Sequence, residues 1–237
     1  MSDTELFAEL ERYLIDRNAT FVACADLQQL PAEPRMGLPL GVCIGVRLET
    51  SIIAGITEGP TPEYAAEYVR VNELLQRLGE HCATFLQGRG FRAVSFAPPI
   101  DLKDRESLET PLPHKTVATL AGTGWVGKCA LLVTESYGSA VRFNTVFTDT
   151  PLPADEPVEV SRCGECDFCV TACPAGAVSG CQWHQGLERA LFFDAAACRD
   201  CASRLGAKAG SDRTICGICI AVCPYTQRYL NGNKGKS

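Results

Sequence analysis

The stretch CGECDFCVTACP, residues 163–174, decides the fold of this 237-residue chain. Its cysteines follow the spacing Cys-x2-Cys-x2-Cys-x3-Cys-Pro, which is the complete bacterial ferredoxin run. In such a run three thiolates hold one [4Fe–4S] cluster, and the fourth reaches a second cluster. Cysteines two residues apart on a tight loop can converge on neighbouring irons, whereas the last pair stands about one helical turn apart. The stretch therefore predicts a double-cluster iron–sulfur module.

An incomplete second copy of the pattern, CGICIAVCP, occupies residues 216–224. Arg213 stands where its first cysteine should lie, so one ligand must come from elsewhere. The cross-ligation rule of two-cluster ferredoxins assigns one cluster to Cys163, Cys166, Cys169 and Cys223. It assigns the other to Cys173, Cys216, Cys219 and one upstream cysteine, for which Cys198 and Cys201 are the nearest candidates and Cys181 is farther away.

Zinc is the competing interpretation of these cysteines. Cys198-x2-Cys201 and Cys216-x2-Cys219 approach the spacing of a tetrathiolate zinc ribbon, but this leaves both Cys-Pro pairs without a role. Ten of the fourteen cysteines fall between residues 163 and 223, and we favour two clusters. The remaining four lie in apolar or helical stretches and are expected to be small core residues: Cys24, Cys43, Cys82 and Cys129.

Composition and charge place the chain among globular proteins, with 46% hydrophobic and 21% charged residues. The net charge of −6 differs from the basic face that nucleic-acid binders usually show. The acidic N-terminus carries no export signal, and the longest apolar stretch, 37–46, is too short to cross a bilayer. We therefore expect a cytoplasmic protein, in which clustered cysteines favour metal or redox roles over disulfides.

The front half of the chain alternates helical and strand patterns. A capping box at Ser2-x-x-Glu5 and a Thr61-Pro62 pair each open a helix, and short apolar runs predict strands over 20–26, 40–48 and 91–97. Segments 130–134 and 141–147 predict a hairpin around Tyr137-Gly138-Ser139, and the acidic, proline-rich stretch 151–160 is interpreted as a linker. The predicted fold class is α+β, with a layered α/β domain at 1–154 followed by a two-cluster ferredoxin-like domain at 155–237.

A glycine-rich loop, GTGWVGKC at 122–129, satisfies most of the phosphate-loop pattern and the dinucleotide fingerprint. Both motifs need a strand before the glycines and a helix after them. Here residues 114–121 have a helical pattern, and the residues after the loop have a strand pattern. The order argues against nucleotide binding, although glycines around Trp125 and Lys128 suit close approach to a flat ligand.

An ordered string of motifs resembles the epoxyqueuosine reductases and their shorter relatives over about residues 60–225. The string comprises His114-Lys115, the loop from Ala121 to Lys128, Leu131-Leu132, Tyr137-Gly138-Ser139, Thr148-Asp149-x-Pro151-Leu152 and the ferredoxin run. The resemblance implies a cobalamin-binding α/β domain joined to a double-cluster ferredoxin domain, distantly akin to reductive dehalogenases. It also implies Cys198 as the upstream ligand, because in the family this ligand follows a hydrophobic-Asp segment, here Phe192-Phe193-Asp194.

The resemblance further implies which residues face the cofactors, which would be two [4Fe–4S] clusters and cobalamin. The cofactor-binding candidates are His114, Lys115, Gly124, Trp125, Gly127 and Lys128. The position of the family's acidic proton donor holds Leu108, with Glu109 adjacent, so no catalytic acid is assigned. The family's members also carry a C-terminal helical-repeat domain that grips tRNA, whereas this chain ends 14 residues beyond Cys223. Together with the acidic charge, this argues against tRNA as a partner.

These inferences favour an enzyme, an iron–sulfur oxidoreductase whose clusters pass low-potential electrons to a corrinoid or another redox ligand in residues 1–154. The alternative is a non-catalytic ferredoxin-type electron carrier or reductive activator of a partner protein. The expected partners are an electron donor such as reduced ferredoxin or flavodoxin, and a small-molecule or corrinoid ligand. The sequence leaves the organic substrate and the oligomeric state open.

Overall fold

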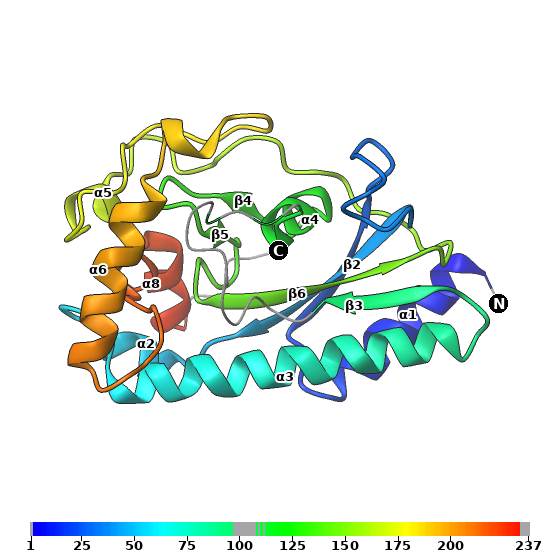
Figure 1. Cartoon of the computed structure of the whole chain (residues 1–237). Coiled ribbons are helices and arrows are strands. Elements are labelled where there is room, and N and C mark those ends of the chain that lie inside the picture. The colour runs from blue at the N-terminus through cyan, green and yellow to red at the C-terminus, as the bar shows by residue number, and fades with distance from the viewer. Residues whose placement is uncertain (1, 97–107, 109, 111, 233–237) are drawn as a thin grey trace. The chain divides into compact units, whose positions relative to one another are not determined.

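The computed structural model of the chain describes residues 2–96, 108, 110 and 112–232 (Figure 1). These residues form a mixed α+β structure that divides into two compact units, each assembled from separate segments of the chain. Unit 1 comprises residues 1–46, 71–123 and 142–158, and unit 2 comprises residues 47–70, 124–141 and 159–237. Within the described part of the chain, no helix has the length and apolar character needed to span a membrane.

Unit 1 is built around a four-stranded sheet in the order β1-β2-β6-β3. Strand β1 pairs antiparallel with β2, and β3 pairs antiparallel with β6. The bounds of the strands and of the helices with them are β1 Phe21–Asp26, β2 Leu40–Arg47, β3 Ala93–Phe96, β6 Val141–Thr148, α1 Asp3–Ile15, α3 Pro62–Gln87 and α4 His114–Leu120. The boundary between the units falls within α3, so only its C-terminal part belongs here.

Helices cover both sides of this sheet, and glycines allow their close approach. Figure 1 shows α3 and α4 on opposite sides of the strands. A Cβ on Gly41 of β2 would lie 2.8 Å from Val117 of α4. A Cβ on Gly79 of α3 would collide with Ser95 and Asn144 of β3 and β6. Both predicted helix starts are confirmed, by the capping box at Ser2 and by a hydrogen bond from the Tyr64 N–H to Thr61 Oγ1.

Unit 2 holds the cysteine run together with short helices and a two-stranded sheet of β4 and β5. Its elements are α2 Thr50–Ala54, the first part of α3, β4 Trp125–Val126, β5 Leu132–Val133, α5 Phe168–Thr171, the 3₁₀ turn η1 Arg189–Leu191, α6 Ala195–Lys208, α7 Ile218–Ala221 and α8 Pro224–Leu230. Most of these elements are short, and α6 is the longest of those that lie wholly within the unit.

The two compact units do not follow the predicted domain boundary between residues 154 and 155. Segments 47–70 and 124–141 precede that cut but belong to the unit with the cysteine run. Side-chain hydrogen bonds hold them there, for example from Tyr229 Oη to the Leu48 carbonyl at 2.9 Å. The stretch interpreted as a linker is also anchored, since the backbone N–H of Asp155 donates to the Cys24 carbonyl in β1.

The predicted hairpin of segments 130–134 and 141–147 is wrong. Strand β5 pairs antiparallel with β4 in the small sheet, and β6 belongs to the large sheet of unit 1. The turn itself is present, because Thr134 and Gly138 exchange backbone hydrogen bonds. The argument against nucleotide binding is supported, since helix α4 precedes the glycine-rich loop and strand β4 lies within it.

Three of the four cysteines expected in the core, Cys24, Cys43 and Cys82, are completely buried in unit 1. Burial, with added repulsion from Asp155 and Asp26, raises the pKa of Cys24 to about 12. Burial also raises the pKa of Cys43 to about 12. A thiol reacts through its thiolate, so these groups combine two causes of low reactivity.

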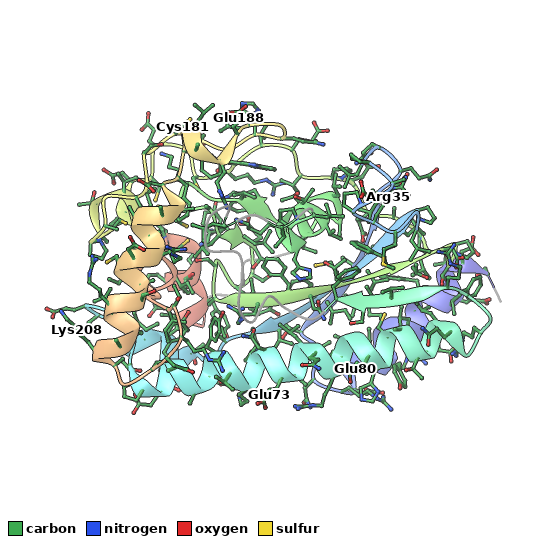
Figure 2. The ribbon with its side chains drawn as sticks, in the orientation of Figure 1. Arg35, Glu73, Glu80, Cys181, Glu188 and Lys208 are labelled. Carbon is green, nitrogen blue, oxygen red and sulfur yellow. The ribbon has the colours of Figure 1, made fainter. Side chains whose placement is uncertain are left out.

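We therefore expect Cys24, Cys43 and Cys82 to stay unmodified when the folded, metal-loaded protein is treated with iodoacetamide at pH 8. Cys181 is exposed and serves as the internal control, because it should be alkylated in the same sample (Figure 2). Peptide mass spectrometry reads all four sites. Alkylation of the three buried thiols as fast as Cys181 would contradict the packing of unit 1.

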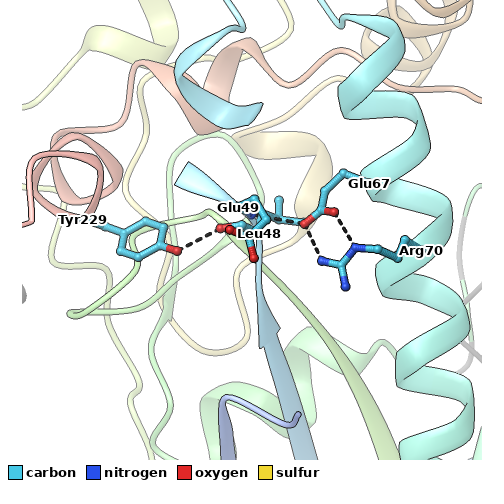
Figure 3. Close-up of polar contacts among 5 residues, drawn as sticks. All are labelled: Leu48, Glu49, Glu67, Arg70 and Tyr229. Atoms are coloured by element: carbon cyan, nitrogen blue, oxygen red, sulfur yellow. Dashed lines mark hydrogen bonds and ion pairs between the residues drawn. The ribbon is translucent and has the colours of Figure 1, made fainter. Parts of the chain in front are cut away.

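A single peptide group in unit 2 is held from both sides (Figure 3). Its carbonyl, on Leu48, accepts the Tyr229 hydroxyl, and its N–H, on Glu49, donates to Glu67 Oε1 at 3.1 Å. The Glu67 carboxylate is buried and is neutralised by Arg70, whose Nε lies 2.7 Å from Oε2. The arrangement ties the chain between β2 and α2 to both α3 and α8.

Replacement Glu67→Gln should lower the free energy of unfolding by about 2 kcal/mol, because it weakens hydrogen bonds made by a buried charged acceptor. Urea unfolding followed by circular dichroism measures the change. Glu73→Gln is the matched control, since Glu73 is an exposed glutamate of the same helix (Figure 2). Equal stability of the two variants would show that the Glu67 contacts add nothing.

Candidate functional site

The two copies of the cysteine pattern adopt related local structures. Helix α5 begins at Phe168 and helix α7 at Ile218, so the helices repeat at the same displacement of 50 residues as the cysteines. The two helices also contact each other. The second copy needs a glycine where its helix begins, because Gly217 has a φ of 84°. The repeat recognised in the sequence is therefore a structural repeat, with its two halves packed together.

Cysteines from the two copies lie beside one another. Burial raises the pKa of Cys223, and the nearby Cys163 contributes in the same direction. Burial, together with Cys173, Cys216 and Cys201, raises the pKa of Cys198 to about 11. The last cysteine of each copy thus lies near cysteines outside its own copy, which is the relation that cross-ligation requires.

The structure places both candidate upstream ligands near the second copy. Helix α6 starts after the N-cap Asp194, whose side chain accepts the Ala197 N–H, and carries Cys198 and Cys201 about one turn apart. Cys198 is half-buried and Cys201 is buried. Burial raises the pKa of Cys216, and the nearby Cys201 contributes in the same direction. Cys201 therefore also lies near the second copy, and the choice of Cys198 as the ligand stays a prediction. Cys181 is exposed, and its thiol donates a hydrogen bond to the Gln182 carbonyl at 3.7 Å.

A preformed single-ion site is not found in the part of the chain that the structure describes. No three His, Cys, Asp or Glu side chains among these residues are grouped closely enough to hold a metal ion. A zinc ribbon gathers four thiolates on one ion, whereas a cubane spreads its four thiolates over separate irons. Metal analysis of the protein distinguishes the two interpretations.

The glycine–tryptophan loop packs against the cysteine run. Lys128 is buried and donates from Nζ to the Cys166 carbonyl at 2.9 Å. A Cβ on Gly127 would lie 3.6 Å from the Cys163 sulfur and 2.8 Å from Val133. A Cβ on Gly124 would collide with the Val133 carbonyl. These glycines are therefore required by packing within unit 2, and their contact with a cofactor stays a prediction.

Trp125 lies between residues that flank two cluster cysteines. Its ring is 4.8 Å from that of Tyr225, centroid to centroid, and the Arg162 guanidinium lies 5.5 Å from its centroid. Trp125 is only 1% exposed, and its indole Nε1 has no hydrogen-bond partner among the described residues. A buried N–H without a partner is costly, so this atom indicates a missing acceptor.

The six predicted cofactor-binding residues divide between the units. His114 and Lys115, at the start of α4, belong to unit 1, and the other four, Gly124, Trp125, Gly127 and Lys128, belong to unit 2. His114 is half-buried, and its Nδ1 lies 2.8 Å from Thr145 Oγ1. Leu108 has a left-handed backbone with a φ of 49°, and Glu109 lies outside the described residues.

Cys129 is the residue whose surroundings the sequence analysis missed. It is buried, as expected of a core cysteine, but its sulfur lies beside the cysteine run, because a Cβ on Gly127 would lie 3.7 Å from the Cys129 sulfur and 3.6 Å from the Cys163 sulfur. The signal was its place directly after Lys128, in a loop that the resemblance already linked to the cofactors. Apolar neighbours in the sequence led us to overlook it.

Comparison with curated proteins finds epoxyqueuosine reductases. That of Salmonella typhimurium is 33% identical over 132 residues, covering 53% of this chain and 31% of the relative. That of a Synechococcus species is 32% identical over 170 residues, covering 70% of this chain and 49% of the relative. The chain is a relative of the epoxyqueuosine reductases. It spans between about a quarter and a half of the length of the curated relatives it matches, and no family model matches it.

Solved structures place the fold with the same proteins. An epoxyqueuosine reductase structure matches with a TM-score of 0.65 and 19% identity, over 99% of this chain and 68% of that one. A catabolic reductive dehalogenase, bound to 3-bromo-4-hydroxybenzoic acid, matches with a TM-score of 0.67 and 17% identity, over 92% of this chain and 31% of that one. The mixed α+β fold is therefore shared with both classes of reductase.

Our expectation that tRNA is not a partner is contradicted. A similar solved structure is an epoxyqueuosine reductase with an epoxyqueuosine-modified tRNA stem loop, with a TM-score of 0.64 and 18% identity. The similarity covers 99% of this chain and 68% of that one. The expectation relied on the family's C-terminal helical-repeat domain and on net charge, which averages over the surface and does not report a local basic patch.

Proposed function

We propose that this chain is an iron–sulfur oxidoreductase related to epoxyqueuosine reductase, with two [4Fe–4S] clusters that deliver electrons to a corrinoid or another redox ligand. One cluster is held by Cys163, Cys166, Cys169 and Cys223. The other is held by Cys173, Cys198, Cys216 and Cys219. Each bound cluster accepts and passes on one electron at a time at low potential.

The observation that carries this proposal is the exchange of cysteines between the two copies. Cys223 of the second copy lies near Cys163 of the first, and Cys173 of the first copy lies near Cys198 and Cys216. Two independent metal sites, one for each copy, would not need this exchange. A double-cluster ferredoxin fold does need it.

The polar groups around these cysteines fit negatively charged clusters. The Ala177 N–H donates to the Cys173 sulfur at 3.4 Å. The neighbouring Cys129 and burial raise the pKa of Cys169, whereas the positive charge of the buried Lys128 opposes this rise. Hydrogen bonds and nearby positive charge stabilise electron-rich sulfur ligands. The unpartnered Trp125 Nε1, close to Arg162 and Tyr225, supports an acceptor that the protein chain itself does not supply.

We further propose that His114 and Lys115 contact the ligand. The other four cofactor-binding candidates would mainly support the cysteines that hold the clusters: Gly124, Trp125, Gly127 and Lys128. The buried contacts of the glycine–tryptophan loop with Cys163 and Cys166 support this division. A corrinoid as the ligand is supported by a structural neighbour, with a TM-score of 0.66 and 16% identity, described as a B12-dependent reductive dehalogenase. Epoxyqueuosine on a tRNA stem loop is the substrate that the curated relatives indicate.

Anaerobic turnover with and without cobalamin tests the proposal. Dithionite-reduced protein is mixed with an epoxyqueuosine-modified stem loop, and mass spectrometry follows the modified nucleoside, while absorbance follows cobalamin uptake. We expect cobalamin to bind and the nucleoside to be reduced only in its presence. Iron-loaded protein that neither binds cobalamin nor reduces the nucleoside would favour the electron carrier instead.

A further inference from the structure

The indole N–H of Trp125 is a buried hydrogen-bond donor in unit 2 that has no acceptor among the residues that the structure describes. The side chain is only 1% exposed, so bulk water does not take the place of the acceptor. Buried polar groups in folded proteins are nearly always paired. The fold therefore holds a donor whose acceptor lies outside the polypeptide.

Strand pairing shows which way the indole lies. Trp125 of β4 is paired with Val133 of β5, and residues paired across an antiparallel ladder share one face of the sheet. A Cβ on Gly127 would lie 2.8 Å from the Val133 side chain and 3.6 Å from the Cys163 sulfur. The face of the small sheet that carries Trp125 is therefore the face beside the cysteine run.

The other face of the small sheet is apolar. Val126 is buried in a cluster with Ala130 and Phe192, and Trp183 packs against that cluster. Successive side chains of a strand alternate between its two faces, so Val126 lies opposite Trp125. The two tryptophans of the chain thus belong to opposite faces of the sheet.

The neighbours of the indole flank two cysteines that are assigned to one cluster. Tyr225, whose ring centroid lies 4.8 Å from that of Trp125, follows Cys223 by two residues. Arg162, whose guanidinium lies 5.5 Å from the Trp125 centroid, directly precedes Cys163. The Tyr225 hydroxyl donates to the Arg162 carbonyl at 3.3 Å, so the two flanks are joined to each other beside the indole.

We propose that the Trp125 indole donates a hydrogen bond to a sulfide of the cluster that Cys163 and Cys223 share, and that this bond raises the reduction potential of that cluster. The inference rests on the proposed function, because it needs the cluster. The described cysteines leave the N–H unpaired, so the acceptor is a sulfide of the cluster rather than a thiolate. Reduction makes the cluster sulfurs more negative, and a donor therefore stabilises the reduced form more than the oxidised form.

The first test compares Trp125→Phe with Trp183→Phe in anaerobically purified, cluster-loaded protein. Iron is measured first, and the reduced clusters are then followed by electron paramagnetic resonance during a potentiometric titration. At fixed potential the ratio of reduced to oxidised form of one cluster should fall roughly fivefold in Trp125→Phe, as for loss of one hydrogen bond. Trp183→Phe is the matched control and should leave the ratio unchanged, because it removes an indole from the opposite face.

An unchanged ratio in Trp125→Phe with full iron content would overturn the inference and leave the proposed function intact. The same ratio combined with weaker cobalamin uptake would assign the indole N–H to the corrinoid and would also overturn it. Wild-type protein that binds no iron would overturn both the inference and the proposed function.

A second measurement leaves Trp125 in place and so does not depend on whether its replacement releases the cluster. In Trp183→Phe the remaining tryptophan is Trp125, so tryptophan labelled with ¹⁵N in the indole marks its Nε1 alone. Electron–nuclear double resonance of the reduced protein should then detect a coupling of this ¹⁵N to the cluster. Fully loaded protein without the coupling would overturn the inference.

Discussion

Replacement Cys198→Ala should lower the iron content of the anaerobically purified protein from about eight to about four atoms per chain. Cys198 lies near Cys173 and Cys216, two proposed ligands of the same cluster. The proposed cluster is held by four thiolates, and we expect the loss of one of them to release the whole cluster during purification. Iron analysis together with the visible absorbance of the protein measures the result.

Cys201→Ala is the matched variant, because Cys201 lies about one turn away on the same helix and is also near Cys216. It should keep about eight irons per chain, since Cys201 is spare in the proposed assignment. The reverse pattern, with iron lost in Cys201→Ala and kept in Cys198→Ala, would exchange the roles of the two cysteines. It would also remove the support that the Phe192-Phe193-Asp194 segment lends to Cys198.

The second large effect is expected at Gly138, in the turn that follows β5. Gly138 has a φ of 56°, and a Cβ there would collide with the backbone nitrogen of Thr226 in α8. The Thr226 hydroxyl also accepts the Ser139 N–H at 3.0 Å. Gly138→Ala combines backbone strain with overpacking against a main-chain atom and should lower the free energy of unfolding by about 3 kcal/mol or more.

Gly176→Ala separates the two causes. Gly176 has nearly the same φ, 59°, but a Cβ there would meet nothing within 4 Å. This variant carries only the conformational cost, about 1 kcal/mol. Thermal unfolding followed by circular dichroism compares the two, and equal losses of stability would contradict the close approach of the turn to α8.

Much of the fold could be predicted from local patterns. The Ser2 capping box and the Thr61-Pro62 pair set the starts of α1 and α3, because capping involves residues only a few positions apart. The repeat of the cysteine pattern likewise reappears as the matching helices α5 and α7. These features depend on short-range contacts, which a single sequence displays directly.

Long-range pairing could not be predicted in the same way. The pattern around Tyr137-Gly138-Ser139 indicated a hairpin of adjacent strands, but β5 pairs with β4 and β6 pairs with β3. Segments 47–70 and 124–141 join the unit of the cysteine run through hydrogen bonds to residues about 40 to 180 positions away, such as Lys128 to Cys166 and Tyr229 to Leu48. Such contacts leave no periodic signal in the sequence.

The site shows the same division. Spacing alone indicated the ligand sets, yet it left Cys198 and Cys201 as alternatives, because both precede the second copy on one stretch of chain. Lys128 is buried and donates to the Cys166 carbonyl, a contact that the sequence did not indicate, and its predicted contact with a cofactor stays a prediction. The cysteines near Cys129 could not be predicted, because its expected burial does not identify the residues that surround it.

The most direct test of the account is the metal content of protein purified without air. Iron and acid-labile sulfide are measured for each chain, with Mössbauer spectroscopy on ⁵⁷Fe-enriched protein to identify the type of cluster. The account predicts about eight irons and about eight sulfides, all in [4Fe–4S] clusters. A colourless protein with zinc and no labile sulfide would contradict it.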